Sequence, residues 1–217
     1  MLHLETIEPA TLDLLKRLQT LPVFAETRLV GGTALALQLG HRVSVDLDIF
    51  GKWDYAADLV AELSKIGRVE KESGTASGKM AFLYVEDIKV DCVSYEEYRW
   101  LDPPVEESGV RLAGVRDIAA MKINAITNRG TRKDFVDMAR LLEDHPLEEM
   151  FAWYREKYPA ANPALAMRSM SYFADAETMP MPRMLTPFDW AVAKDRIRAA
   201  VRELVVANPS ATHIRPE

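Results

Sequence analysis

Cysteine is nearly absent from this sequence, which has Cys92 alone among its 217 residues. A single thiol excludes an internal disulfide and a cysteine-based zinc cluster, and it fits a reducing compartment, so we expect a cytoplasmic protein. No stretch approaches the roughly 18 consecutive apolar residues of a membrane span. Residues 1–15 carry acidic side chains and no apolar run. We therefore expect neither a signal peptide nor contact with a membrane.

An excess of basic charge is also lacking. The net charge is −6 and the isoelectric point is near 5.4, whereas a protein that coats nucleic acid is usually basic. Any contact with RNA must then come from a local patch that acts against the overall field. This weakens a general nucleic-acid-binding function and leaves room for an enzyme that touches one end of an RNA.

The hydrophobic pattern changes character along the chain. Up to about residue 115, short alternating segments predict strands between helices, and residues 101–108 (LDPPVEES) are interpreted as a Pro-rich acidic connector. After residue 115 the pattern is helical throughout. We therefore predict an α/β core with an N-terminal helix over residues 1–115 and a helical region over 116–217, packed on that core.

The stretch VGGTALALQLGHRVSVDLDIF (30–50) has the composition of a binding site. A strand over 27–30 would end at Gly31 and Gly32, and a helix over 33–39 would follow and stop at Gly40. The segment VSVDLDIF (43–50) alternates with a period of two, which predicts a strand that projects Asp46 and Asp48 from one face.

A third aspartate, Asp91, alternates in the same way within IKVDCV (88–93). Carboxylates gathered on one sheet face repel one another, so such a group usually binds a cation. Magnesium prefers oxygen ligands and commonly sits between carboxylates and substrate phosphates, and a pair of such ions can clamp a phosphoryl transfer. Backbone amides at a Gly-Gly-Thr turn that opens a helix favour a phosphate. Taken singly, the glycine pair also fits a tight turn and DLD an exposed strand face.

Together these motifs resemble the signature of the polymerase beta-like nucleotidyltransferase superfamily. More specifically, the chain resembles the AbiEii/AbiGii-type toxin nucleotidyltransferases. That family also has a lysine helix followed by an Arg/Lys-Asp-x-x-Asp helix, matched by MKINAITNRGTRKDFVDMARLL (121–142). The segment YFADAETMPMPRML (172–185) is similar to the tail of one branch. The resemblance implies a mixed sheet of the nucleotidyltransferase fold, flanked by helices, and covers nearly the whole chain.

The resemblance implies roles for ten residues. The catalytic residues would be Asp46, Asp48, Lys122 and Asp134; the nucleotide would be bound by Gly31, Gly32, Thr33, Arg42, Lys122 and Asp137; and the metal ligands would be Asp46, Asp48 and Asp91.

Several of these residues also have a purely structural interpretation. Lys122 could extend its ammonium out of an apolar helix. Asp134 could cap the next helix, three residues after Thr131 as N-cap, which is the spacing of a capping box. Asp137 could be a surface ion-pair partner, Arg42 part of a turn, and Asp91 outside the metal site.

The implied activity is a Mg²⁺-dependent transfer of a nucleoside monophosphate from a nucleoside triphosphate (NTP), with one or two ions. The acceptor would be an RNA such as tRNA, and the enzyme would be the toxin of a toxin–antitoxin or phage-defence system with a cognate antitoxin. Two alternatives remain at this point. One is an antibiotic-type nucleotidyltransferase that modifies a small molecule, and the other is a non-catalytic nucleotide-binding module.

Overall fold

The computed structural model describes residues 1–52, 56–74 and 79–207. Within it the chain divides into two compact units, Met1–Gly114 and Val115–Glu217. No helix in these described ranges is long and apolar enough to cross a membrane.

The first unit is built on a mixed seven-stranded sheet with strand order β3-β4-β5-β2-β1-β7-β6. β2 runs parallel to β5 and β1 runs parallel to β7, and the other neighbours are antiparallel. The strands are β1 (Arg28–Val30), β2 (Leu47–Gly51), β3 (Val69–Gly74), β4 (Met80–Val85), β5 (Ile88–Ser94), β6 (Val105–Glu107) and β7 (Val110–Leu112). The helices are η1 (Leu4–Thr6), α1 (Pro9–Thr20), η2 (Pro22–Phe24), α2 (Gly31–Leu39) and α3 (Ala56–Leu63).

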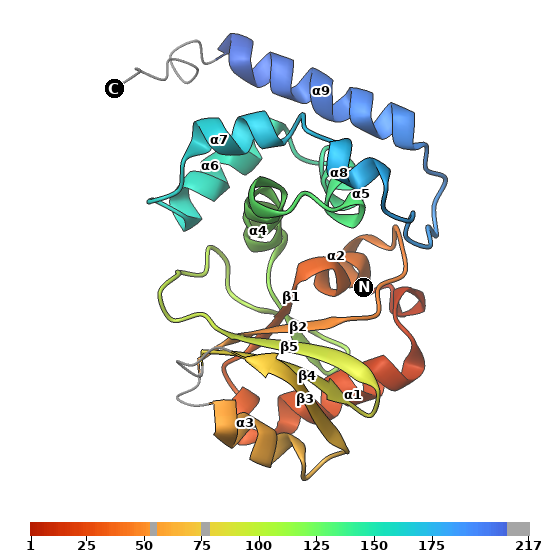
Figure 1. Ribbon diagram of the computed structural model, residues 1–217, viewed down its shortest axis with the longest axis vertical. Helices are drawn as coiled ribbons and strands as arrows, with labels where there is room; N and C mark the ends of the chain where they lie inside the picture. The colour runs from red at the N-terminus through yellow and green to blue at the C-terminus, as the bar shows by residue number, and fades with distance from the viewer. Residues whose placement is uncertain (53–55, 75–78, 208–217) are drawn as a thin grey trace. The chain divides into compact units, whose positions relative to one another are not determined.

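One face of this sheet forms the core of the unit. Alternation buries Leu47 and Ile49 in β2 and Val90 and Cys92 in β5. Helices α1 and α3 lie on the same side of the sheet in Figure 1. The residues between the buried ones, among them Asp48 and Asp91, are half-buried. Apolar burial thus fixes the register and directs polar side chains to the other face.

Two sequence-based predictions in this unit are wrong. The strand predicted over 43–50 begins only at Leu47, so Asp46 lies just before it. The reason is that residues 43–46 are bonded elsewhere, since the Ser44 N–H donates to the Thr6 carbonyl. The connector predicted over 101–108 contains β6, which pairs with β7 through a turn where Ser108 and Gly109 have φ of 57° and 80°. Such positive φ values are typical of tight hairpins.

The second unit is helical. Its helices are α4 (Val115–Asn128), α5 (Arg132–Leu141), α6 (Leu147–Lys157), α7 (Pro163–Ser169), α8 (Ala174–Glu177) and α9 (Trp190–Ala207). α9 buries Ala193, Ile197 and Leu204 on one stripe.

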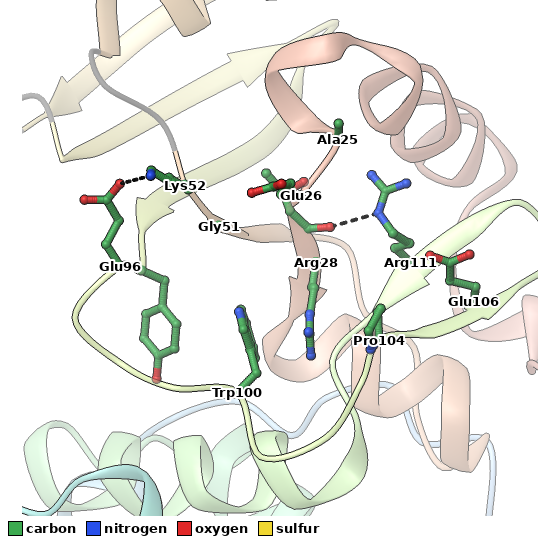
Figure 2. A pocket seen from close by; sticks show the side chains of 12 residues that line it. Ala25, Glu26, Arg28, Gly51, Lys52, Glu96, Trp100, Pro104, Glu106 and Arg111 are labelled. Carbon is green, nitrogen blue, oxygen red and sulfur yellow. Dashed lines mark hydrogen bonds and ion pairs between the residues drawn. The ribbon is translucent and has the colours of Figure 1, made fainter.

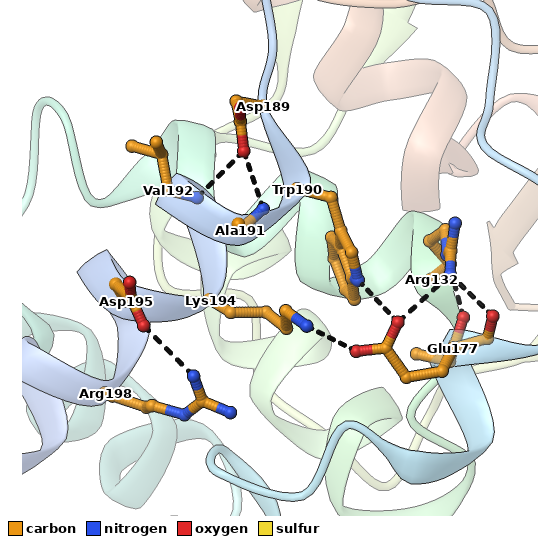
Figure 3. A network of polar contacts seen from close by, with 10 residues as sticks. Arg132, Glu177, Asp189, Trp190, Ala191, Val192, Lys194, Asp195 and Arg198 are labelled. Atoms are coloured by element: carbon orange, nitrogen blue, oxygen red, sulfur yellow. Dashed lines mark hydrogen bonds and ion pairs between the residues drawn. The ribbon is translucent and has the colours of Figure 1, made fainter.

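A polar network joins α5, α8 and α9 within this unit (Figure 3). The Glu177 carboxylate accepts hydrogen bonds from the Trp190 indole at 3.0 Å and from the Lys194 ammonium. The Arg132 guanidinium donates to the Ala176 and Glu177 carbonyls at 2.8 and 2.7 Å. These bonds add side-chain donors to the carbonyls at the C-terminal end of the short helix α8.

Candidate active site

Gly31, the first residue of α2, lies directly against a carboxylate. Its φ is +69°, and a Cβ at this position would lie 2.1 Å from Asp48 Oδ2. No side chain can occupy that space, so glycine is what allows Asp48 to approach the start of the helix. The first amides of a helix have no intrahelical acceptor and favour an anion. The glycine turn and the aspartate strand therefore meet at one place.

The same helix holds Asp46. The Thr33 hydroxyl is buried, donates to the Asp46 backbone carbonyl and shares a 2.8 Å hydrogen bond with the Ser44 hydroxyl. Because its hydroxyl is engaged in this way, Thr33 acts as a tether between the first turn of α2 and the residue that precedes β2. Gly32, which lies between Gly31 and Thr33 in α2, is half-buried.

Asp48 and Asp91 are direct neighbours across the sheet. Val30 pairs with Asp48 in the antiparallel ladder of β1 and β2, and Asp48 pairs with Asp91 in the parallel ladder of β2 and β5. Residues paired in this way project from the same face. The next pair along this ladder is Leu47–Val90. Asp46 precedes Leu47 on one side, and Lys89 precedes Val90 on the other.

The two oxygens of Asp91 differ in their surroundings. Oδ2 lies 3.0 Å from the Lys89 ammonium. Oδ1 is buried and has no hydrogen-bond partner. The hydrogen bond to Asp91 raises the pKa of Lys89, and the charges of Asp91, Asp46 and Asp48 add to this effect against the opposing effect of burial. Lys89 is therefore a cation that interacts with all three carboxylates.

The donor set fits a divalent cation. Asp46, Asp48 and Asp91 supply carboxylate oxygens, which Mg²⁺ prefers, and the unpartnered Oδ1 of Asp91 is an oxygen able to accept a ligand bond. Within residues 1–52, 56–74 and 79–207, however, no three Asp, Glu, His or Cys side chains are already grouped closely enough to hold a metal. A bound ion would have to draw these carboxylates together.

Arg42 takes a buried position in the first unit. Its side chain is 2% exposed, and its Nη1 donates to the Val43 carbonyl at 3.1 Å. The role in nucleotide binding that the resemblance implied for Arg42 stays a prediction.

The remaining predicted residues form a buried ionic cluster in the helical unit. Lys122 Nζ on α4 lies 2.9 Å from Asp134 Oδ1 and 2.6 Å from Asp137 Oδ2, both on α5. The lysine side chain is 6% exposed and both aspartates are fully buried. Two carboxylates thus surround the ammonium, which binds α4 to α5.

Asp134 has a second structural role. Its Oδ2 accepts hydrogen bonds from the Thr131 hydroxyl at 2.5 Å and the Thr131 backbone N–H at 3.3 Å, which confirms the predicted capping box. Burial alone would raise the pKa of Asp134. The charge of Lys122, the Thr131 hydrogen bond and the charge of Arg129 outweigh burial, so the pKa lies below its usual value.

Two polar contacts of the structure were not predicted from the sequence. Lys157 Nζ and Asp117 Oδ1 form a 2.6 Å ion pair with both side chains at 0% exposure. They are 40 residues apart, so no local spacing indicated the pair. Lys89 did have a signal, because the alternation that places Asp91 on the polar face of β5 also places Lys89 there.

A cavity of about 610 Å³ lies at the start of β1 and at the ends of β2 and β5, away from Gly31 and Asp48 (Figure 2). Gly51 at the end of β2 and Tyr95 after β5 line it, together with Arg28 at the start of β1. The Arg28 guanidinium lies 4.3 Å from the centroid of the Trp100 ring. None of the ten predicted site residues, all in the described part of the chain, lines this cavity.

The comparison with protein families agrees with this geometry. A model of the nucleotidyl transferase AbiEii toxin family, part of type IV toxin–antitoxin systems, matches residues 13–210. The chain belongs to this family. The family and the enzyme class predicted from the motifs are thereby confirmed, and the protein is a nucleotidyltransferase of a toxin family.

The chain is also similar to individual known proteins. The chain is 32% identical over 171 residues to the uncharacterized protein aq_aa25 of Aquifex aeolicus (strain VF5), covering 76% of this chain and 82% of the relative. The crystal structure of JHP933 from Helicobacter pylori superposes with a TM-score of 0.55 at 16% identity, covering 95% of this chain and 97% of JHP933. A second H. pylori structure gives 0.53 at 14% identity, covering 95% and 99%. These likenesses show the fold, and the predicted fold class is confirmed.

Proposed function

We propose that this enzyme transfers a nucleoside monophosphate from an NTP to an RNA acceptor such as tRNA, in a Mg²⁺-dependent reaction. It would act as the toxin of a pair and be restrained by a cognate antitoxin. The family supports the nucleotidyl transfer. The metal, the RNA and the antitoxin are the proposed parts.

The approach of Asp48 to Gly31 carries the proposal. A carboxylate that can hold a cation lies against the first residue of a helix whose amides can hold a phosphate. Asp91 is the neighbour of Asp48 in the sheet. An NTP needs both kinds of group at once, because its phosphates bind amides and its charge requires a cation.

The residues at the start of α2 then have defined tasks. When bound, Mg²⁺ would neutralise charge on the phosphates. Gly31 and Gly32 present backbone amides to the triphosphate, and Thr33 keeps Asp46 close to them through the Asp46 carbonyl. During transfer the acceptor hydroxyl oxygen bonds to the α-phosphorus, the bond to pyrophosphate breaks, and the hydroxyl proton is released. Positioning and charge neutralisation supply most of the rate in such reactions.

The Lys122 cluster is assigned a positioning role in this proposal. Its ammonium is already balanced by Asp134 and Asp137, so it keeps α4 and α5 in register whether or not a nucleotide is present. Contact between Lys122 and a nucleotide phosphate stays a prediction.

An RNA end is compatible with the acidic composition. With a net charge of −6, the protein repels a long polyanion, but a few local cations are enough to bind a single terminus.

The test is a transfer assay with each α-labelled NTP, Mg²⁺ and total tRNA. Asp46→Asn and Asp48→Asn, made singly, remove one charge each without changing side-chain size. Asp13→Asn on the outer surface of α1, where the side chain is 69% exposed, is the matched control. We expect label on tRNA with the wild type and Asp13→Asn, and at least a hundredfold less with Asp46→Asn or Asp48→Asn.

Other outcomes would change the proposal in defined ways. Label that persists in Asp48→Asn would remove the metal role of that residue. No label on RNA, with labelled nucleotide retained by the wild type in a Mg²⁺-dependent way, would direct the search to a small-molecule acceptor.

A further inference from the structure

Lys89 is a charged residue of the candidate site with no role in the proposal above. It lies on the same face of β5 as Asp91, two residues before it, and β5 buries Val90 and Cys92 on the other face. A lysine on this face places positive charge where a cation site requires negative charge.

The contact between Lys89 and Asp91 is direct and partly shielded. The ammonium lies 3.0 Å from Oδ2, and the exposed fractions of the two side chains are 35% and 16%. A charge-assisted hydrogen bond in such a setting is stronger than one on an open surface. Lys89 therefore occupies one of the two oxygens of Asp91, and the other, Oδ1, is left without a partner.

This arrangement conflicts with metal binding at Asp91. An oxygen bound to an ammonium cannot be drawn fully towards a divalent cation, and the ammonium repels any cation placed among Asp46, Asp48 and Asp91. The conflict agrees with the finding that no three metal-binding side chains in the described ranges are grouped. Either the lysine moves or Asp91 binds the metal weakly.

We propose that Lys89 is a built-in competitor for the divalent cation, which holds Asp91 through Oδ2 and releases it only when the metal binds. The inference rests on the proposed function, because it assumes that these carboxylates take a metal. Lys89 would thus set the metal concentration at which the site assembles. It acts through Asp91 and is a positioning residue.

The test measures Mn²⁺ binding to the full-length protein without nucleotide, by the electron paramagnetic resonance signal of free Mn²⁺. Lys89→Met keeps the length of the side chain and removes its charge. Loss of one repelling charge a few ångströms from the ion predicts an affinity about five- to tenfold higher than that of the wild type. Lys89→Arg keeps the charge and should bind Mn²⁺ as weakly as the wild type.

Lys79→Met is the matched control for net charge. Lys79 pairs with Glu97 at 2.8 Å, and both side chains are exposed. This variant should leave Mn²⁺ affinity unchanged. In an Asp91→Asn background, Lys89→Met should have a smaller effect than in the wild type. The reason is that this background lacks the Asp91 carboxylate for which Lys89 and the metal compete.

Four results would overturn the inference. They are an unchanged or lower affinity in Lys89→Met, an equal gain in Lys79→Met, an undiminished effect of Lys89→Met in the Asp91→Asn background, and no Mn²⁺ binding by any variant. The transfer assay separates this failure from that of the proposed function. Transfer that depends on Asp48, with no effect of Lys89 on Mn²⁺ affinity, overturns only the competitor role. Mn²⁺ binding that depends on Lys89, with no transfer to any acceptor, overturns only the proposed function.

Discussion

At the residue scale, one methyl group at Gly31 should be enough to disable the site. In Gly31→Ala the new Cβ would meet Asp48 Oδ2 at 2.1 Å, so the carboxylate must leave the start of α2. The positive φ adds backbone strain of about 1–2 kcal/mol. We expect nucleotidyl transfer to fall at least tenfold and the free energy of unfolding to fall by about 1–3 kcal/mol, measured by the transfer assay and urea denaturation.

Gly109→Ala is the matched control for this change. Gly109 also has a positive φ, +80°, but an added Cβ would meet nothing closer than Lys16 Cε at 3.8 Å. This variant should show a similar strain cost without a loss of transfer. Equal losses of activity in both variants would show that strain alone explains the effect.

Sequence reasoning at this scale succeeded where a local rule applied and failed where the partner was remote. Alternation in β2 and β5 placed Asp48 and Asp91 on one face because the buried residues between them fix the pleat. The position of Asp46 depended on a bond from Ser44 to Thr6, which no local pattern reveals. Lys89 was overlooked because a cation among carboxylates matches no metal-binding motif.

At the element scale, the Lys122 cluster should account for much of the stability of the helical unit. Lys122→Met removes the ammonium that lies between two buried carboxylates and leaves only Arg129 beside Asp134, so we expect a loss of about 3–5 kcal/mol in the free energy of unfolding. Urea denaturation followed by circular dichroism measures it. Lys133→Met, at an exposed position of α5, should change stability by less than about 0.5 kcal/mol.

A triple variant distinguishes charge balance from packing. Lys122→Met combined with Asp134→Asn and Asp137→Asn removes every charge of the cluster and should cost less than Lys122→Met alone. A triple variant less stable than the single one would mean that hydrogen bonds of the aspartates, such as the capping box, outweigh the cost of the unbalanced charge.

The low pKa of Asp134, which the charge of Lys122 and then the Thr131 hydrogen bond maintain, predicts a dependence of stability on acid. Since the folded protein holds the pKa of Asp134 below its unfolded value, this residue stabilises the folded state at pH values above about 4. That stabilisation is lost as the pH falls through the lower, folded pKa. We expect Asp134→Asn to be less stable than the wild type at neutral pH and to lose less stability on acidification, as measured by urea denaturation at several pH values. Parallel stability curves for the two proteins would contradict this assignment.

Helices with strong periodicity were predictable at this scale, and short edge strands were not. α5 and α9 follow from their apolar spacing and, for α5, from the Thr131 cap. β6 and β7 have three residues each, too few for a period to be recognised. The Ser108-Gly109 turn between them was the available signal.

At the scale of the whole molecule, the net charge of −6 limits how the proposed RNA acceptor can bind. Contacts to about three phosphates of a single-stranded end predict a slope of about −2 when the logarithm of the binding constant is plotted against that of the salt concentration. Fluorescence anisotropy with a labelled tRNA 3′ end measures this slope. A slope steeper than about −6 would indicate an extensive phosphate interface instead of a terminus.

Because Cys92 is buried, the reactivity of its thiol reports when the sheet of the first unit opens. Cys92 lies in β5 between Ile49 of β2 and Ala81 of β4, is fully buried, and has a thiol whose pKa is raised by burial. A thiol-specific dye can react only after these central strands separate. Since the sequence holds no other cysteine, the labelling rate of the unmodified protein reports the opening of strands β2, β4 and β5. A ligand that binds beside Asp91 should slow this labelling. Binding could therefore be followed without an engineered probe.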